Sequence, residues 1–427
     1  MAGDLINGDI PDHWEFTTLG EICQRGGGNI QTGPFGSQLH ASDYVPVGIP
    51  SIMPTNIGDN RIVEEGIVRI TEEDANRLGQ HRVEVGDIVY SRRGDVEKRA
   101  LIRDREEGWL CGTGCLKVRL GSGVVDPLFA SLFLGHPSIR EWITRHAVGA
   151  TMPNLNTSIM SAVPIALPPL DEQEAIAAVL GALDDKIELN RRMNATLEAM
   201  ARALFQSWFV DFDPVRAKLD GRQPVGLDPA TAALFPATFE ETSLGHVPHG
   251  WEVKTLGEVI ELAYGKPFKA EDRKHGPVCV YGANGPVGWH DEKLVSGPGI
   301  VVGRKGNPGV VTWAHGDFYP IDTTFYVEPI GVCRSLYFFY YALLLHNLSN
   351  LSADSAVPGL NRNHAYMSKQ VIPSQPVLTA FDSLIAPIFA AMHANEEQSR
   401  SLALARDTLL PKLLSGELTV PLMPRPE

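Results

Sequence analysis

The sequence predicts an α+β protein in which two duplicated lobes with twisted sheets are separated by two long antiparallel coiled-coil helices. Three observations support this fold class. A block near the start returns in the second half, each repeat ends in a segment with heptad periodicity, and both lobes alternate short β-rich runs with Gly and Pro turns. With 427 residues, the chain is long enough for several domains.

The repeat is marked by two sequence blocks. A Pro-x-x-Trp-Glu run followed by Thr-Leu-Gly-Glu covers 11–21 and returns at 248–258, an offset of 237 residues. A Pro-x-Leu-Asn block covers 153–156 and returns at 358–361, an offset of 205 residues that also fits the segments that follow. The halves share a beginning and an end while their middles diverge, which indicates two homologous lobes acting on different targets. A duplication kept for stability alone is the alternative.

Each repeat ends in a helical segment whose apolar residues are spaced alternately by four and three, as in a coiled coil. The seam of the first helix contains Ile176, Leu180, Leu183, Ile187, Asn190, Asn194, Leu197, Ala201, Leu204 and Trp208. The seam of the second contains Phe381, Ile385, Ile388, Met392, Asn395, Ser399, Leu402, Leu409 and Leu413, with Arg406 as a misfit. We expect the two stripes to pack against each other as a spacer roughly 60 Å long. A generic helical hairpin is the alternative.

These patterns set the expected domain boundaries. The two lobes cover 1–168 and 248–375, and the two helices cover 169–210 and 376–418. Asp171 and Glu174, just after two prolines, indicate the start of the first helix. Residues 211–247 contain many turn signals and are expected to be a linker draped over the surface, and 419–427 form a C-terminal tail.

Residues 20–150 are expected to form a mixed lobe with a twisted, mostly antiparallel sheet. The expected strands are 48–52, 61–63, 86–91 and 116–119, and a helix at 127–147 closes the lobe. The second lobe repeats this arrangement with strands at 299–304 and 325–327 and a helix at 336–345.

Paired cations follow equivalent strands in the two lobes. Arg92-Arg93-Gly94 follows one strand and Arg304-Lys305-Gly306 follows the other. Two cations and a glycine at the end of a strand put positive charge on a loop whose backbone can approach a ligand closely, which suits a phosphate contact. Solvated surface charge is the alternative interpretation.

Other loops carry amide, hydroxyl and aromatic side chains that can read base edges or stack on bases. The candidate DNA-binding residues of the first lobe are Gln31, Thr32, Phe35, Ser37, Arg92, Arg93, Lys98, Asn154 and Asn156. Those of the second lobe are Tyr264, Lys266, Asn284, Arg304, Lys305, Asn361 and Arg362. Each of these loops could equally be an ordinary turn.

The chain carries no motif for chemistry. It lacks a Gly-x-x-x-x-Gly-Lys-Ser/Thr phosphate loop and an Asn/Asp-Pro-Pro-aromatic motif for holding a flipped base, and its 13 histidines form no His-Glu-x-x-His pair. Cys111 and Cys115 are closely spaced, but no second Cys or His pair accompanies them at metal-binding spacing, and five cysteines suggest reduced thiols. We expect no catalytic residue, metal or cofactor in this chain.

The net charge of −14 argues against a simple nucleic-acid binder. The acid excess lies in the first half, whereas 248–375 hold as many cations as acids, so local basic faces are expected and partner chains would share the electrostatic work. The first twenty residues carry acids and no apolar core, and no run reaches eighteen apolar residues. We therefore expect a cytoplasmic protein without a membrane span.

The chain resembles the specificity (S) subunits of type I restriction-modification enzymes over nearly its whole length. The resemblance lies in the repeated Pro-x-x-Trp-Glu and Thr-Leu-Gly-Glu starts and in the following four segments. They are Leu-Pro-Pro-Leu-Asp-Glu-Gln at 167–173, Leu-Phe-Gln-Ser-Trp-Phe-Val-Asp-Phe-Asp-Pro at 204–214, Gly-His-Val-Pro-His-Gly-Trp at 245–251 and Leu-Leu-Pro-Lys-Leu-Leu-Ser-Gly-Glu-Leu at 409–418. The second helix departs from the pattern, with Pro-Ser-Gln-Pro-Val-Leu at 373–378, so docking of partners at the two ends is expected to be unequal.

The resemblance implies that each lobe is a target-recognition domain that reads one half of a split, asymmetric DNA site, with the helices setting the gap. It implies two methyltransferase subunits that carry S-adenosylmethionine and methylate adenine, and usually two motor-nuclease subunits that use ATP and Mg²⁺. The chain itself would be non-catalytic. A subunit of a related phage-defence or methylation-only system is the nearest alternative, and neighbouring genes would separate the two. The sequence fits less well with an enzyme that has a cleft between the lobes, or with a coiled-coil scaffold that binds no DNA.

Overall fold

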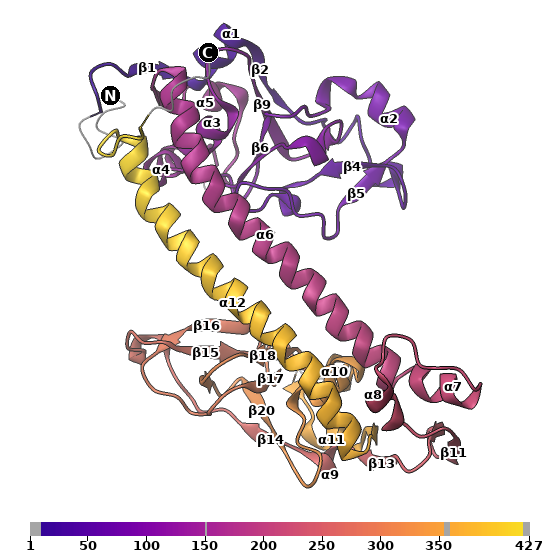
Figure 1. The fold of residues 1–427 in the computed structure, drawn as a ribbon. Helices are drawn as coiled ribbons and strands as arrows, with labels where there is room; N and C mark the ends of the chain where they lie inside the picture. The colour runs from indigo at the N-terminus through magenta and orange to yellow at the C-terminus, as the bar shows by residue number, and fades with distance from the viewer. Residues whose placement is uncertain (1–9, 150–151, 354–358, 422–427) are drawn as a thin grey trace. The chain divides into compact units, whose positions relative to one another are not determined.

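The computed structural model describes residues 10–149, 152–353 and 359–421, which form two compact units (Figure 1). Unit 1 comprises Met1–Glu188 and Ser399–Glu427, and unit 2 comprises Leu189–Gln398. Two helices of 40 residues, α6 (Leu170–Phe209) and α12 (Gln375–Leu414), each contribute a part to both units. The predicted α+β class, with duplicated lobes and two long helices, is confirmed.

Unit 1 holds the first lobe. Its strands are β1 (Glu15–Thr18), β2 (Gly27–Thr32), β3 (Tyr44–Val45), β4 (Ile49–Ile52), β5 (Val68–Ile70), β6 (Ile88–Ser91), β7 (Arg99–Leu101), β8 (Leu110–Cys111), β9 (Cys115–Gly121) and β10 (Pro164–Leu167). Its helices, besides the part of α6 and α12, are α1 (Leu19–Gly26), α2 (Glu72–Arg77), α3 (Pro127–Leu134), α4 (Pro137–His146) and α5 (Thr157–Ser161).

Unit 2 holds the second lobe. Its strands are β11 (Phe239–Thr242), β12 (Gly245–Pro248), β13 (Glu252–Thr255), β14 (Ile260–Tyr264), β15 (Val278–Gly282), β16 (Gly285–His290), β17 (Gly299–Gly303), β18 (Val311–Ala314), β19 (Phe318–Pro320), β20 (Thr324–Pro329), β21 (Ser352–Ala353), β22 (Gly359–Leu360) and β23 (Lys369–Ile372). Its further helices are α7 (Asp213–Leu219), α8 (Pro229–Ala233), α9 (Leu256–Val259), α10 (Leu336–Leu345) and α11 (Arg362–Met367).

The central sheets of the two lobes have the same topology. The first runs in the order β2-β9-β6-β7 and the second in the order β14-β20-β17-β18, and every neighbouring pair in both is antiparallel. Among the strands that the structure describes, β4 pairs parallel with β8 and β15 pairs parallel with β19, outside these two sheets. The duplication visible in the sequence is therefore a duplication of the whole sheet.

The segments that the two repeats share lie at the start and at the end of each lobe, and they pair with each other. β1 pairs antiparallel with β10, and β13 pairs antiparallel with β23, so the start of each repeat lies against its end. The Thr-Leu-Gly-Glu motif starts a helix directly after the opening strand. The Thr18 backbone N–H donates to the Glu21 carboxylate at 3.1 Å, and the Thr255 N–H donates to Glu258 at 2.7 Å, as in a capping box.

The glycine of this motif is required by close packing. A Cβ atom at Gly20 would lie 2.8 Å from the Cβ of Ser161 in α5, and one at Gly257 would lie 2.9 Å from the Cβ of Tyr366 in α11. Any larger residue would push α1 from α5 or α9 from α11. The four residues of the motif thus fix one helix start and one helix contact in each lobe.

The start of the second long helix, where 373–378 depart from the pattern of the first, also differs in structure. In unit 1, the indole N–H of Trp14 donates to the Glu172 carboxylate at 3.1 Å. The residue that corresponds to Glu172 is Val377, which is fully buried, and the indole nitrogen of Trp251 is buried without a hydrogen-bond partner in the described part of the chain. The second repeat thus has a buried apolar side chain where the first has a charge-assisted hydrogen bond.

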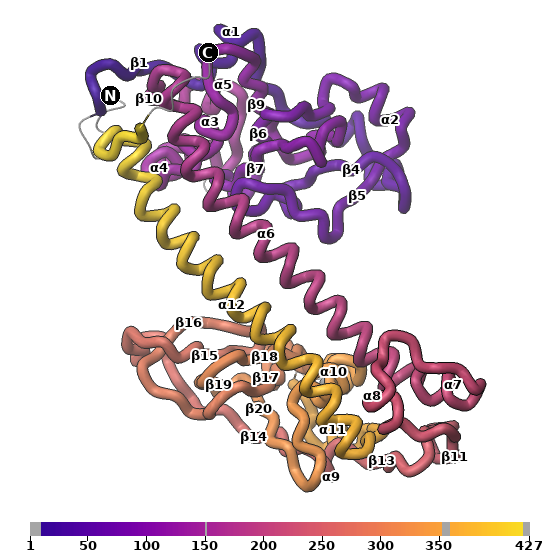
Figure 2. The backbone as a smooth tube through the Cα atoms, in the orientation of Figure 1, coloured from indigo at the N-terminus to yellow at the C-terminus, as the bar shows by residue number. Residues whose placement is uncertain are grey.

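The two long helices lie side by side within each unit and run antiparallel (Figure 2). In unit 2, the Asn190 amide donates to the Asn395 carbonyl at 3.3 Å and to Gln398 at 2.9 Å, and the Asn194 amide donates to the Met392 carbonyl at 3.0 Å. The predicted seam residues are all buried or half-buried: Leu180, Leu183, Ile187, Asn190, Leu197, Leu204, Ile385, Ile388, Met392, Asn395, Leu402 and Leu409. Polar residues on both helices therefore fix one register.

The misfit Arg406 fills its seam position with an ion pair inside unit 1. Its guanidinium lies 2.8 Å from the Asp184 carboxylate, and the side chains are only 20% and 14% exposed. Burial alone would lower the pKa of Arg406, but the hydrogen bonds and charges of Asp184 and of the more exposed Asp407 outweigh burial and raise it. The sequence misfit is therefore a paired charge between α6 and α12.

Replacing Asp184 with alanine is expected to lower the free energy of unfolding by about 3 kcal/mol, because it leaves the Arg406 charge mostly buried and without its main partner. The double variant Asp184→Leu with Arg406→Leu should lie close to the parent or above it. Urea unfolding of the parent, of Asp184→Leu, of Arg406→Leu and of the double variant measures this coupling. Additive losses in the double variant would contradict the pairing.

Three expectations differ from the structure: the linker at 211–247, the single helix at 127–147 and the strand at 61–63. Residues 211–247 are not a surface linker: they form α7, α8 and a hairpin of β11 with β12, and Val215, Phe235 and Val247 are buried in the core of unit 2. The turn signals at Pro214 and Pro229 are helix starts, where proline fits because its missing N–H is not needed. Most of the predicted tail 419–427, and Pro358 of the second Pro-x-Leu-Asn block, lie outside the described residues.

The helix expected at 127–147 is two helices, α3 and α4, because Pro137 cannot continue a helix and disfavours helical backbone at the residue before it. The strand expected at 61–63 is absent from the described part. Ile62 makes only an isolated bridge with Ile57, and Asn60 turns the chain with a φ of 53°. The expected helix at 336–345 is α10.

Helix α12 is long and apolar enough to cross a membrane by length and composition alone, which the sequence analysis did not anticipate. Protein packing accounts for its apolar side chains at both ends. Val377, Phe381 and Ile385 are buried in the core of unit 2, and Leu413 and Leu414 are buried in the core of unit 1. Both ends of the helix thus pack against protein, one in each unit.

Two buried histidines are expected to make the stability of unit 1 depend on pH. Burial lowers the pKa of His81, assisted by the charge of Lys117, and burial lowers the pKa of His136. The fold therefore favours the neutral rings, so the unfolded chain takes up protons first as the pH falls below about 6.5. Stability is expected to be complete above that pH and to decline on acidification.

Urea unfolding at pH 7.5 and pH 5.5 checks this expectation. His136→Gln should reduce the loss between the two pH values, whereas His40→Gln, which changes an exposed ring, should leave it unchanged. An identical loss in the His136 variant and the parent would contradict the assignment.

Candidate nucleic-acid interface

The predicted loops lie at one edge of the central sheet in each lobe. β2 and β6 both pair antiparallel with β9, so their carboxyl ends reach the same edge. β14 and β17 are related in the same way through β20. Phe35 follows β2 and Arg92 follows β6, while Tyr264 ends β14 and Arg304 follows β17. Sheet topology therefore brings the aromatic and cationic candidates together twice.

The Pro-x-Leu-Asn block meets the cationic loop in both lobes. The Leu155 N–H donates to the Arg92 carbonyl at 2.9 Å, and the Leu360 N–H donates to the Arg304 carbonyl, also at 2.9 Å. Isolated bridges join Arg93 to Asn154 and Lys305 to Gly359. Two segments that are far apart in the sequence thus form one surface, which we call the sheet-edge interface.

Arginine lies over an aromatic ring in both copies of this interface. The Arg92 guanidinium carbon is 5.7 Å from the centroid of Phe35, whose side chain is 56% exposed. Arg304 and Arg362 lie 4.9 and 5.1 Å from the centroid of Tyr264, which is 51% exposed. These cation–π contacts hold an exposed aromatic surface at the sheet edge.

The two cations of each pair have different surroundings. The Arg92 Nε donates to the Leu155 carbonyl at 3.1 Å, and burial together with the charge of Arg93 lowers its pKa. Arg304 donates to the Asp322 carbonyl at 2.9 Å. Arg93 and Lys305 are exposed. The first cation of each pair therefore orders the loop, and the second presents charge to solvent.

Two candidate asparagines cap helices. The Asn156 side-chain oxygen accepts from the Ile159 N–H at 2.8 Å at the start of α5. The Asn361 oxygen accepts from the N–H groups of Asn363 and His364 at 3.0 and 3.2 Å at the start of α11. Capping alone explains why asparagine stands at these positions in both repeats. Their contact with DNA stays a prediction.

The other candidates are spread around the interface. Gln31 and Thr32 are half-buried in β2, Ser37 is exposed in the next loop, and Lys98 pairs with Asp95 at 2.9 Å. Asn284 is exposed in the turn between β15 and β16, and the Lys266 N–H donates to the Pro320 carbonyl at 3.1 Å. The structure gives these residues no common contact with the cation–aromatic groups.

Sequence reasoning missed apolar and ordering residues of the interface. Val148 and Met152 are 63% and 62% exposed beside Asn154, and apolar side chains in such positions can contact or wedge between bases. The Tyr366 hydroxyl accepts from the Leu262 N–H at 2.8 Å, and its ring lies 5.4 Å from Arg362. Only the neighbouring Pro-x-Leu-Asn blocks pointed toward these residues.

The closely spaced thiols in the first lobe are structural. Cys111 and Cys115 are buried, and burial raises the pKa of Cys111 to about 12 and that of Cys115 well above its usual value. The Cys115 thiol donates to the Ile52 carbonyl at 3.2 Å. Protonated, buried thiols are poor nucleophiles and poor metal ligands.

Comparison with known proteins agrees with this architecture. Two curated relatives are the specificity subunit of the type I restriction enzyme HindI from Haemophilus influenzae, 26% identical over 86% of this chain and 95% of that protein, and the MjaIX specificity subunit from Methanocaldococcus jannaschii, 25% identical over 97% and 95%. The crystal structure of a type I restriction-modification system S subunit from M. genitalium covers 98% of both chains with a TM-score of 0.56 at 19% identity, which shows the same fold.

Residues 11–199 and 248–374 match the family described as the type I restriction modification DNA specificity domain. These segments include both lobes and most of the first long helix. Because they make up well over half of the chain, it belongs to the family of type I restriction-modification specificity subunits, which are non-catalytic.

Proposed function

We propose that the two lobes bind the two halves of a bipartite, asymmetric DNA site and that the chain thereby directs adenine methylation or cleavage by partner subunits. The observation that carries this proposal is the duplicated sheet-edge interface. Both copies place an exposed aromatic ring, an ordered arginine and an exposed cation at the same edge of the same sheet. Different residues around this shared frame would read different half-sites.

The cation–aromatic groups suit both parts of DNA recognition. Arg93 and Lys305 can pair with phosphates, which positions the protein without reading sequence. Phe35 and Tyr264 offer flat apolar surfaces for bases or sugars, and Gln31, Asn154 and Asn284 offer amides for base edges. The remaining candidates, Thr32, Ser37, Lys98, Asn156, Lys266 and Asn361, belong to the same proposal.

In the proposed domain assignment, target-recognition domains occupy 1–168 and 248–375. The helices at 169–210 and 376–418 are spacers that set the gap between half-sites. Their length of 40 residues corresponds to about 60 Å. The hydrogen bonds of Asn190 and Asn194 to α12 support a fixed register, which a spacer of defined length needs.

A type I specificity subunit works in a complex. We propose two methyltransferase subunits and two motor-nuclease subunits as partners in the cytoplasm, with S-adenosylmethionine, ATP and Mg²⁺ bound by those partners. The net charge of −14 supports shared contact with DNA, because an acidic chain alone would neutralise few phosphates. No membrane partner is proposed.

Sequencing the methylome of cells that express this chain with its methyltransferase tests the function. We expect methylated adenines in a bipartite motif whose half-site centres lie about one DNA turn apart, because two lobes then meet the same face of the duplex. The same cells without this chain are the control. A continuous, ungapped motif would contradict the two-lobe proposal.

A further inference from the structure

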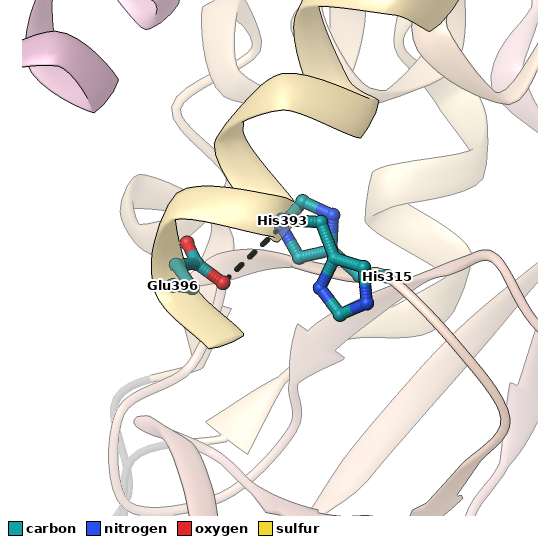
Figure 3. A group of neighbouring side chains, drawn as sticks. All are labelled: His315, His393 and Glu396. Atoms are coloured by element: carbon teal, nitrogen blue, oxygen red, sulfur yellow. Dashed lines mark ion pairs between the residues drawn. The ribbon is translucent and has the colours of Figure 1, made fainter. Parts of the chain in front are cut away.

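Two histidines and a glutamate meet in unit 2, away from the sheet-edge interface. His315 lies between β18 and β19, and His393 and Glu396 lie on α12. The two imidazole rings are stacked with centroids 4.8 Å apart, and His315 Nε2 lies 3.6 Å from the Glu396 carboxylate (Figure 3). One possible ligand atom from each residue lies within 4.8 Å of the other two.

The backbone around this group is held by a packed aromatic cluster. Trp313 of β18 lies 4.7 Å from Phe389 of α12, ring centroid to ring centroid, and both side chains are buried. His315 follows Trp313 by two residues, and His393 follows Phe389 by one helical turn. The same contact that packs the strand on the helix therefore aligns the two histidines.

We propose that His315, His393 and Glu396 form a binding site for a divalent transition-metal ion of the zinc class. Two imidazoles and one carboxylate are a common protein ligand set for such an ion, with water in the fourth position. The spacing of His393 and Glu396, three residues apart on one helix, places both on the same face.

The candidate ligand atoms are close to the separations that a bound ion requires. Metal–ligand bonds of 2.0–2.1 Å separate tetrahedral ligand atoms by about 3.3 Å, so the present separations have to shrink by roughly 1.5 Å at most. The side chains of His315 and Glu396 are 16% and 46% exposed, so an ion can reach the site from solvent. The glutamate would offset part of the charge of the ion.

A bound ion would fasten the turn between β18 and β19 to α12. β18 is the edge strand of the central sheet in unit 2, and its pairing with β17 is its only described strand contact. The ion would link β18 to α12 and would not contact the residues of the sheet-edge interface. The expected role is therefore structural.

Titration of the full chain with Zn²⁺ and with Co²⁺ tests the site. We expect one ion per chain and, for Co²⁺, the intense visible absorption of tetrahedral coordination. His315→Gln and His393→Gln should each weaken binding by on the order of 100-fold or more, since each removes a ligand. His275→Gln, which changes an exposed histidine of the same unit, should leave binding unchanged.

Unfolding of the same proteins gives a second readout. Zn²⁺ at about 100 times its Kd should raise the melting temperature of the parent and of the His275 variant by about 5–10 °C, and should not raise that of the other two. Metal-free melting curves show whether each variant is folded. Equal Zn²⁺ binding by all four proteins, or no binding by the folded parent, would overturn the proposal.

Discussion

Replacing Arg93 and Lys305 together with alanine is expected to weaken binding of the complex with methyltransferase to every DNA sequence by about 100-fold. Both side chains are exposed at equivalent positions of the two lobes, and each would pair with one phosphate. A charged hydrogen bond contributes about 1.5 kcal/mol or more, which corresponds to about tenfold per residue. The loss should be uniform because phosphates carry no sequence information.

The salt dependence distinguishes this mechanism from base reading. Each lost phosphate contact should reduce the slope of log K against log salt concentration by about 0.9, and the double variant by about 1.8. Fluorescence anisotropy with specific and unrelated duplexes at several salt concentrations gives both quantities. Arg25→Ala with Lys293→Ala removes two exposed cations near the starts of β2 and β17, away from the interface, and is the matched control. Lost discrimination at one base pair with an unchanged slope would make Arg93 or Lys305 a base reader.

Arg92 and Arg304, unlike Arg93 and Lys305, make contacts within the protein. Their guanidinium groups already donate to backbone carbonyls and lie over aromatic rings. Alanine at these positions should disturb the loop as well as the charge, so the doubled cation motif contains one ordering residue and one exposed residue. A variant that removes Arg92 and Arg93 together would mix the two effects.

Deleting one heptad from each long helix is expected to shorten the gap between the two methylated half-sites by about three base pairs. Seven residues of helix span about 10.5 Å, close to three steps of 3.4 Å along the duplex. A deletion of seven keeps the heptad phase, with a drift of only about 20°. Methylation should also weaken, because three base pairs turn the duplex through roughly a third of a turn.

The deletion in α6 can be placed between two residues that tie this helix to the lobes. In unit 1, Arg61 pairs with Glu188 of α6 at 3.0 Å, and in unit 2 the Tyr341 hydroxyl donates to Glu198 of α6 at 3.0 Å. Residues 189–195 lie between these contacts, and 392–398 of α12 contain the hydrogen-bond partners of Asn190 and Asn194. Insertion of seven residues at the same places should lengthen the gap, and deletion of three should break the seam. An unchanged gap after the seven-residue deletion would refute the spacer role.

Sequence patterns predicted the elements whose signal is local. The heptad seams, the strands that end at Ser91 and Gly303 and the helix at 336–345 all combine periodicity with clear boundaries. The repeat then indicated equivalent cationic loops in the two lobes. The sheet topology places these loops beside the ends of β2 and β14, which forms the sheet-edge interface. Family resemblance added the function, which periodicity alone does not contain.

What the sequence did not reveal depends on contacts between distant segments. Nothing near Arg406 shows that Asp184 faces it, and nothing near His315 shows that His393 lies beside it. The Asp-Pro and Gln-Pro pairs of 211–247 read equally well as turns or as helix starts, and burial of Val215 and Phe235 decides between them. The capping roles of Asn156 and Asn361 likewise need the helix that follows each residue.

Unit 1 is built from two stretches of chain, whereas unit 2 is continuous. Leu413 and Leu414 belong to the same core as Trp14 and Leu180, and they are translated only after the whole of Leu189–Gln398. At about 5–20 residues per second, the ribosome needs roughly 10–40 s to make that stretch. The lobe synthesised first thus waits, with part of its core uncovered, until the lobe synthesised second has left the ribosome.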